Sequence, residues 1–166
     1  MKSKKIATYG MLVALAFILS YIESIIPLPI PVPGIKIGLA NLVVITALYL
    51  MGPGDALILS LLRVVLVGFT FGNMSTMMFS LAGGLLSWLV MVLAKRSKVF
   101  SMTGVSILGG ISHNIGQILV AIVVLNTATL VYYLPFLILS GLVTGTVIGI
   151  LGAIITKRVQ KIYANH

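Results

Sequence analysis

The chain has 166 residues, of which 60% are hydrophobic and 8% are charged, and its formal net charge is +9. Soluble domains carry about 25% charged residues, so this composition excludes a soluble globular protein and indicates an integral membrane protein. The absence of cysteine excludes disulfides, thiolate metal sites and a cysteine nucleophile. We expect one transmembrane domain over residues 1–166, with neither metal nor cofactor.

Six apolar segments follow one another and predict an all-α bundle of six transmembrane helices. The first follows a basic N-terminus as a signal peptide would, but its apolar run is too long for one, which favours a retained helix. Prolines alternate at positions 27–33, which favours an extended connection to a short second helix. The predicted helices cover residues 6–26, 35–51, 55–71, 75–94, 102–125 and 130–156.

Basic residues predict the orientation of this bundle. Nine of the 11 lysines and arginines lie in three groups, at residues 2–5, 95–98 and 157–161. With six helices these groups share one side of the membrane, so the positive-inside rule predicts that both termini are cytoplasmic. The groups lie at the edges of apolar spans, which argues against a nucleic-acid partner. We expect a multi-pass protein of the cell membrane.

Arg63 lies in the middle of the third predicted helix, between aliphatic runs on both sides. A charged side chain near the centre of a membrane costs roughly 2.5–3.5 kcal/mol on insertion scales, so it normally faces protein, water or a ligand. Gly68 and Gly72 follow on the same helix and would let another helix approach. The sequence therefore places a candidate binding site around Arg63.

Other polar residues lie at matching depths. A rise of about 1.5 Å per residue puts Arg63 and His113 near mid-membrane, with several polar side chains towards the outer surface. His113 and Gln117 are one helical turn apart and share a face, with Asn114 about 100° away. Together they predict a polar column open to the outside that binds a small polar or anionic substrate. The candidate substrate-binding residues are Lys36, Asn41, Arg63, Asn73, His113, Asn114 and Gln117.

Each of these residues also has a structural interpretation. Arg63 could pair with Glu23 or Asp55, although Glu23 is expected about 25 Å along its helix, a poor match in depth to Arg63 at about 12 Å. His113 and its polar neighbours could instead hydrogen-bond adjacent helices, at roughly 0.6–2 kcal/mol each. Lys36 could be an ordinary interfacial lysine.

Small residues form two stripes. Gly141, Gly145 and Gly149, extended by Gly152, repeat along the sixth predicted helix and favour internal helix packing. Ala7, Gly10 and Ala14 form a similar stripe near the cytoplasmic end of the first helix. That stripe could pack internally or dock a second membrane protein.

Several stretches resemble a known family, the small bacterial Gx transporters, also labelled heptaprenyl diphosphate synthase component I. The resemblance covers roughly residues 7–155 and includes residues 33–52, 60–72, 80–91, 109–117 and 133–145. This family is similar to the substrate-binding S-components of energy-coupling-factor (ECF) vitamin transporters. The resemblance implies six helices with cytoplasmic termini, and docking through small residues of helix 1 onto a transmembrane coupling protein driven by two ATPases. The usual Ala-xxx-Ala pattern is present here only as Gly10-xxx-Ala14.

Two functions remain open. The first is the substrate-binding subunit of a vitamin- or cofactor-like importer of the ECF type, which would need ATPases from elsewhere because the chain has no nucleotide-binding motif. The second is a non-catalytic accessory subunit for prenyl diphosphate or quinone synthesis, or for flavin-linked electron transfer. Prenyl synthases hold magnesium with aspartate-rich motifs, whereas this chain has two acidic residues, Glu23 and Asp55. We therefore expect no enzymatic activity from this chain alone.

Overall fold

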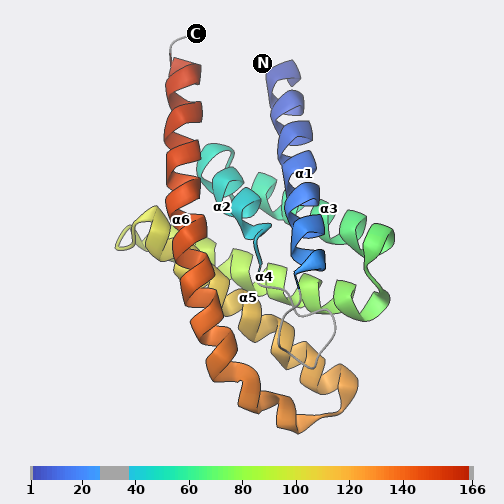
Figure 1. Cartoon of the computed structure of the whole chain (residues 1–166). Coiled ribbons are helices and arrows are strands. Elements are labelled where there is room, and N and C mark those ends of the chain that lie inside the picture. Colours follow the sequence, from blue (N-terminus) through green and yellow to red (C-terminus); the bar gives the residue numbers. More distant parts are fainter. Residues whose placement is uncertain (1, 27–37, 165–166) are drawn as a thin grey trace.

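The computed structural model describes residues 2–26 and 38–164, and the regular structure in these residues is helical (Figure 1). Both chain ends lie at the same end of the molecule, and the connection between the last two long helices lies at the other (Figure 1). In chain order the helices are α1 (Lys2–Ile25), α2 (Asn41–Leu50), α3 (Pro53–Phe71), α4 (Met74–Ser97), α5 (Met102–Leu125), the 3₁₀ helix η1 (Ala128–Tyr133) and α6 (Leu134–Ala164).

Five segments of the described chain are long and apolar enough to cross a membrane: α1, α3, α4, α5, and η1 with α6. The remaining helix, α2, has 10 residues and a length of about 15 Å, about half of the ~30 Å hydrocarbon core. The structure thus agrees with an all-helical membrane protein, but one of the six predicted helices is too short to span.

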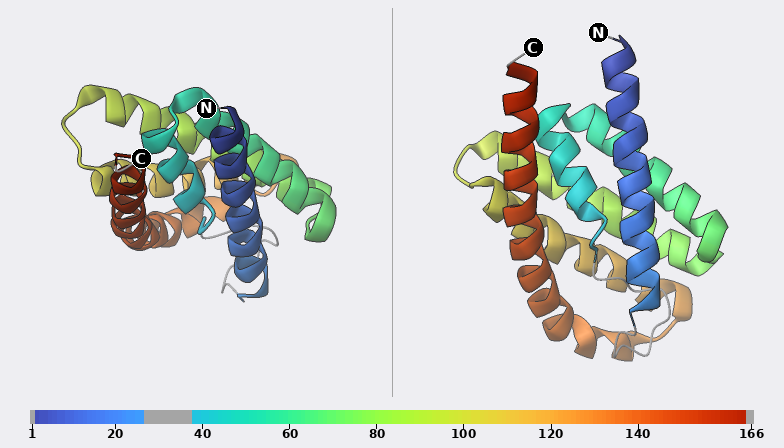
Figure 2. Two further views of the ribbon diagram at one scale, coloured as in Figure 1. Left: turned by 90° about the horizontal axis from the view of Figure 1, so that it is seen from above. Right: turned by 45° about the horizontal axis from the view of Figure 1, so that its top comes forward.

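The short helix α2 lies at the centre of the bundle. It packs against all five of the longer helices, and it lies between α1 and α6 in both views of Figure 2. Every residue from Asn41 to Leu48 is buried, and the apolar ones belong to a hydrophobic cluster that also includes residues of the surrounding helices. A helix enclosed in this way is apolar on all sides, as expected from its environment.

Several predicted helix boundaries differ from the structure. The last helix was expected to end at residue 156, whereas α6 continues to Ala164, and two helices begin later than expected. The second helix was expected from residue 35, but residues 38–40 are not helical and α2 begins at Asn41. Gly38 has a φ of +94°, a left-handed conformation that breaks a right-handed helix. The last helix was expected from residue 130, but α6 begins at Leu134 after η1. Pro135 has no N–H to continue a preceding helix and suits a first turn.

Glycines bring α5 and α6 into backbone contact, as predicted from the stripe on the last helix. A methyl group at Gly145 would lie 2.7 Å from the Ile107 Cα, and one at Gly141 would lie 2.8 Å from the Gly110 carbonyl oxygen. A methyl group at Gly149 would lie 2.6 Å from the Thr103 Cα. The stripe therefore serves internal packing, the role it was predicted to have.

Polar contacts join the helices at the end of α2 that precedes α3. Lys95 of α4 donates a hydrogen bond of 2.7 Å to the Leu48 carbonyl oxygen, and its Nζ lies 4.5 Å from the centre of the Tyr49 ring. Tyr9 of α1 donates to the Asp55 carboxylate in the first turn of α3. These contacts satisfy a C-terminal carbonyl of α2 and connect α1 to α3.

Candidate functional site

A small pocket lies where α1, α3, α4 and α5 meet, with Arg63 and His113 among its walls. Its free volume of about 10 Å³ is the room of roughly one water molecule. Its lining residues are Ser20 of α1, Arg63, Val64, Val67 and Gly68 of α3, Thr76, Met77 and Ser80 of α4, and His113 of α5. Arg63 and His113, which the sequence predicts near mid-membrane, thus line the same pocket.

Arg63 is buried, with 5% of its surface exposed. Among the residues that the structure describes, its Nε and Nη2 have no hydrogen-bond partner. A buried polar group without a partner costs about 1–3 kcal/mol, and more when it is charged. Arg63 is therefore buried in the bundle with N–H groups to which the surrounding side chains give no hydrogen-bond acceptor.

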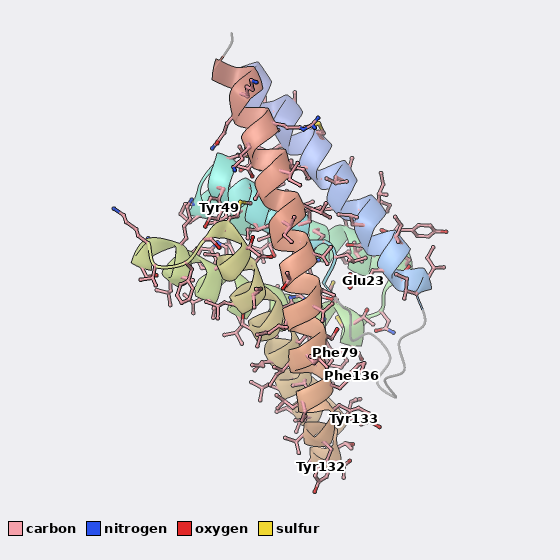
Figure 3. The ribbon with its side chains drawn as sticks, turned by 60° about the vertical axis from the view of Figure 1, so that its left-hand side comes forward. Glu23, Tyr49, Phe79, Tyr132, Tyr133 and Phe136 are labelled. Atoms are coloured by element: carbon pink, nitrogen blue, oxygen red, sulfur yellow. The ribbon has the colours of Figure 1, made fainter. Side chains whose placement is uncertain are left out.

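The expectation that Glu23 lies too far from Arg63 in depth is wrong. The Glu23 carboxylate is buried near the end of α1 (Figure 3) and interacts electrostatically with Arg63. The depth count treats each helix as perpendicular to the membrane, whereas α1 stands steeply in Figure 1 and α3 runs across it. Helices inclined differently can bring residues of different nominal depth together.

Glu23 also holds the backbone that leads into α2. Its Oε1 accepts hydrogen bonds from the Gly38 and Leu39 N–H groups, the latter at 3.4 Å. A methyl group at Gly38 would lie 2.9 Å from the Asn41 Nδ2 and 3.4 Å from the His113 Cδ2. The predicted site residues Asn41 and His113 therefore meet Glu23 around Gly38.

Gly83 of α4 positions the polar face of α5. A methyl group there would lie 2.7 Å from the His113 carbonyl oxygen, 3.1 Å from its Cε1 and 2.8 Å from the Gln117 Cγ. His113 and Gln117 are both almost fully buried. The close approach that glycine permits therefore places both side chains against α4 beside the pocket.

Three predicted substrate-binding residues are not placed with this group. Asn114 is buried, and its Nδ2 donates a 2.7 Å hydrogen bond to the Leu137 carbonyl oxygen of α6. Asn73 is exposed and caps α4, where its side chain and that of Thr76 exchange hydrogen bonds with each other's backbone N–H. Lys36 lies outside the described residues.

Sequence reasoning missed Ser20 as a site residue and assigned Glu23 only to a possible structural pair. A signal was present, because Leu12, Ala16, Ser20 and Glu23 recur at helical spacing and are all buried on one face of α1. When polar residues lie on the same helix face as a run of buried apolar residues, they indicate a polar site inside the bundle.

The predicted docking stripe lies on the opposite face of α1. Ala7, Gly10 and Ala14 are exposed, and no atom lies within 4 Å of where a methyl group at Gly10 would be. Within the described chain this stripe therefore does not serve internal packing.

Comparison with known proteins identifies the family and the fold. The sequence profile of the family described as heptaprenyl diphosphate synthase component I matches residues 12–155. A search of curated proteins finds no match. A solved structure, described as the S component of a bacterial ECF transporter, is 22% identical over 98% of this chain and 99% of that chain, with a TM-score of 0.69.

These findings agree with the apolar helices of the described chain, which make it a multi-pass protein of the cell membrane. At this level of identity, the structural likeness establishes the shape of the bundle. The bundle therefore has an S-component-like fold. Because the profile match covers most of the sequence, the chain belongs to the heptaprenyl diphosphate synthase component I family.

Proposed function

We propose that this protein is the non-catalytic, substrate-binding membrane subunit of a small-molecule importer of the ECF type. The observation that carries the proposal is a pocket walled by four helices, with a buried arginine and a buried histidine, in a bundle shaped like an S component. Ionisable residues inside a membrane bundle are costly and usually functional. A vitamin- or cofactor-like compound fits this class of protein.

The substrate enters from the outer side, and both termini are cytoplasmic. His113, Gln117 and Asn41 supply donors and acceptors that orient the substrate, and Arg63 supplies the charge. Asn114 and Asn73 contribute through the packing and capping of their helices, and Lys36 remains a candidate ligand. This arrangement binds and releases a compound and needs no bond-making step.

A coupling protein docks on the exposed face of α1. Ala7, Gly10 and Ala14 present little side-chain bulk there, which permits close approach by a helix of another membrane protein. Two ATPases joined to that coupling protein would supply the energy, since this chain has no nucleotide-binding motif.

Purification of the tagged protein from its own cells in a mild detergent tests the proposal. We expect ATPase subunits and a transmembrane coupling protein to co-purify, and mass spectrometry to find one small molecule in stoichiometric amount. Arg63→Ala and His113→Ala should both reduce the amount retained at normal membrane levels. Full activity in cells with both variants would contradict the importer.

The name of the family favours a second candidate, an accessory subunit for prenyl-chain synthesis. The two acidic residues, Glu23 and Asp55, belong to separate contacts, one at the start of α2 and one with Tyr9. They cannot form an aspartate-rich magnesium site, so a catalyst would have to be a separate protein. Co-purification of a soluble prenyl synthase or flavoprotein, without ATPases, would support this candidate.

A further inference from the structure

The unpartnered atoms of Arg63 form one edge of its guanidinium group. Nε and Nη2 are bonded to the same carbon, and their N–H bonds run side by side along that edge. Neither atom has a hydrogen-bond partner within the described part of the chain, and the side chain lines the pocket. Two parallel donors of this kind match the two oxygens of a carboxylate or a phosphate.

Glu23 does not occupy this edge. Its Oε1 is used by the Gly38 and Leu39 N–H groups, although its charge still attracts Arg63. The carboxylate therefore has a structural task, to hold the turn before α2, and it lowers the cost of a buried cation without satisfying the Arg63 donors. Removal of the arginine would leave the Glu23 hydrogen bonds in place.

The other walls of the pocket are suited to an anion that forms hydrogen bonds. Ser20 of α1 and Ser80 of α4 contribute hydroxyl groups, and His113 contributes an imidazole. The Thr76 hydroxyl is already used, because it donates to the Asn73 carbonyl oxygen. The space is too small for a ligand as it stands, and Met77 is the wall that can move. Its Sδ would lie 2.7 Å from a methyl group at Gly68, and methionine side chains adapt readily to a new shape.

We propose that the Nε–Nη2 edge of Arg63 binds the anionic group of the imported compound, a carboxylate or a phosphate, in a two-pronged contact. The inference rests on the proposed importer function and specifies its substrate class. Lysine at this position would keep the charge and lose the second prong, so we expect it to hold the anion more weakly than arginine does.

Melting curves in detergent test the proposal with simple probes: potassium phosphate and potassium acetate, each compared with potassium chloride at equal ionic strength and pH. An anion at about ten times its Kd should raise the Tm of the wild-type protein by about 3–6 °C. A response to phosphate alone identifies a phosphate ligand, and a response to acetate alone identifies a carboxylate.

Two variants and a matched control decide the role of Arg63. Arg63→Gln should abolish the anion-dependent rise. In chloride it should melt near the wild type, because the loss of two unpartnered buried donors offsets the loss of the charge that attracts Glu23. Arg63→Lys should keep a reduced rise. Arg96→Gln, the same change at an exposed arginine in the last turn of α4, should behave as the wild type.

The proposal is overturned if the anion-dependent rise persists in Arg63→Gln, is absent from the wild type, or if Arg63→Gln melts well below the wild type in chloride. The last result would mean that Arg63 and Glu23 form a structural ion pair. Failure here is separable from failure of the importer. A protein that still co-purifies with ATPases and an uncharged compound remains an importer, whereas one that retains neither is not.

Discussion

Two neighbouring residues of α5, His113 and Asn114, have different surroundings although both are buried in mid-helix. His113 lies between the Gly38 backbone and Gly83 of α4 and lines the pocket, whereas Asn114 donates to the Leu137 carbonyl oxygen of α6. An offset of about 100° on the helix therefore separates a residue that lines the pocket from one that is hydrogen-bonded to α6.

Asn114→Ala should therefore destabilise the protein without changing its ligand. The substitution removes a buried hydrogen bond, at a cost of about 1–3 kcal/mol, or about 2–4 °C of Tm per kcal/mol. Mass spectrometry should find the same retained compound per folded protein. His113→Ala should instead lower the amount of retained compound, with a smaller change in Tm than Asn114→Ala. A loss of retention in Asn114→Ala at unchanged Tm would assign that residue to the site.

At the residue scale, two residues of the pocket lining could be predicted, but their neighbours could not. Polar side chains inside apolar runs singled out Arg63 and His113, because the membrane makes such residues expensive. The sequence does not reveal helix inclination, so the approach of Glu23 to Arg63 was missed. The sequence also does not reveal which helix packs against each face of α5. For that reason Asn114 was predicted to share a site with His113.

At the scale of the element, α1 has one buried face and one exposed face. Its inner face, from Leu12 to Glu23, packs on α2 and α3 and reaches the pocket, while the stripe of Ala7, Gly10 and Ala14 is exposed. Hydropathy alone predicted the helix, but the two faces could be told apart only once its neighbours were placed.

Gly10→Leu with Ala14→Leu should leave folding intact and abolish co-purification of the coupling protein. A Cβ at position 10 has no neighbour within 4 Å, and Ala14 is exposed, so the Tm and the retained ligand should be unchanged. The added bulk on this face should block the approach of a partner helix. Ala16→Leu is the matched control, because the same change on the buried face should lower the Tm through overpacking, by about 1–3 kcal/mol. If the exposed-face variant unfolds, the stripe is a packing surface.

The glycine contacts between α5 and α6 make a further prediction at this scale. Gly145→Ala places a methyl group 2.7 Å from the Ile107 Cα, so backbone must shift and the cost should be about 1–3 kcal/mol. Gly10→Ala meets nothing within 4 Å and should leave the Tm unchanged or slightly higher. Thermal unfolding of the two variants side by side tests this contrast, and equal Tm values would contradict it.

On the scale of the whole molecule, aromatic residues and charges are arranged along the bundle. Tyr132 and Tyr133 lie at the end remote from the termini, and Tyr49 lies well away from them (Figure 3). Tyrosines are enriched where membranes meet water. Because this enrichment occurs at both surfaces, the tyrosines do not distinguish the two orientations, and cytoplasmic termini stay a prediction from the basic groups at residues 95–98 and 157–161.

Cysteine labelling tests that orientation, on a background that has no native cysteine. Ser97→Cys, at the exposed end of α4, should react with a membrane-impermeant reagent only from the cytoplasmic side. Thr129→Cys, in η1 beyond the other end of α5, should react only from outside. Labelling of both positions from the same side of intact cells would show that α5 does not span the membrane.

The enclosure of α2 also constrains how the protein is made. The ten residues of α2, most of them apolar, are too few to enter a bilayer as an independent span, and their burial depends on contacts with helices on both sides of them in the chain. Among these is α6, where Gly152 lies against Leu42 and Ile45. The core around α2 is therefore completed only after the last helix has been synthesised, and a chain that stops before α6 leaves one side of α2 uncovered.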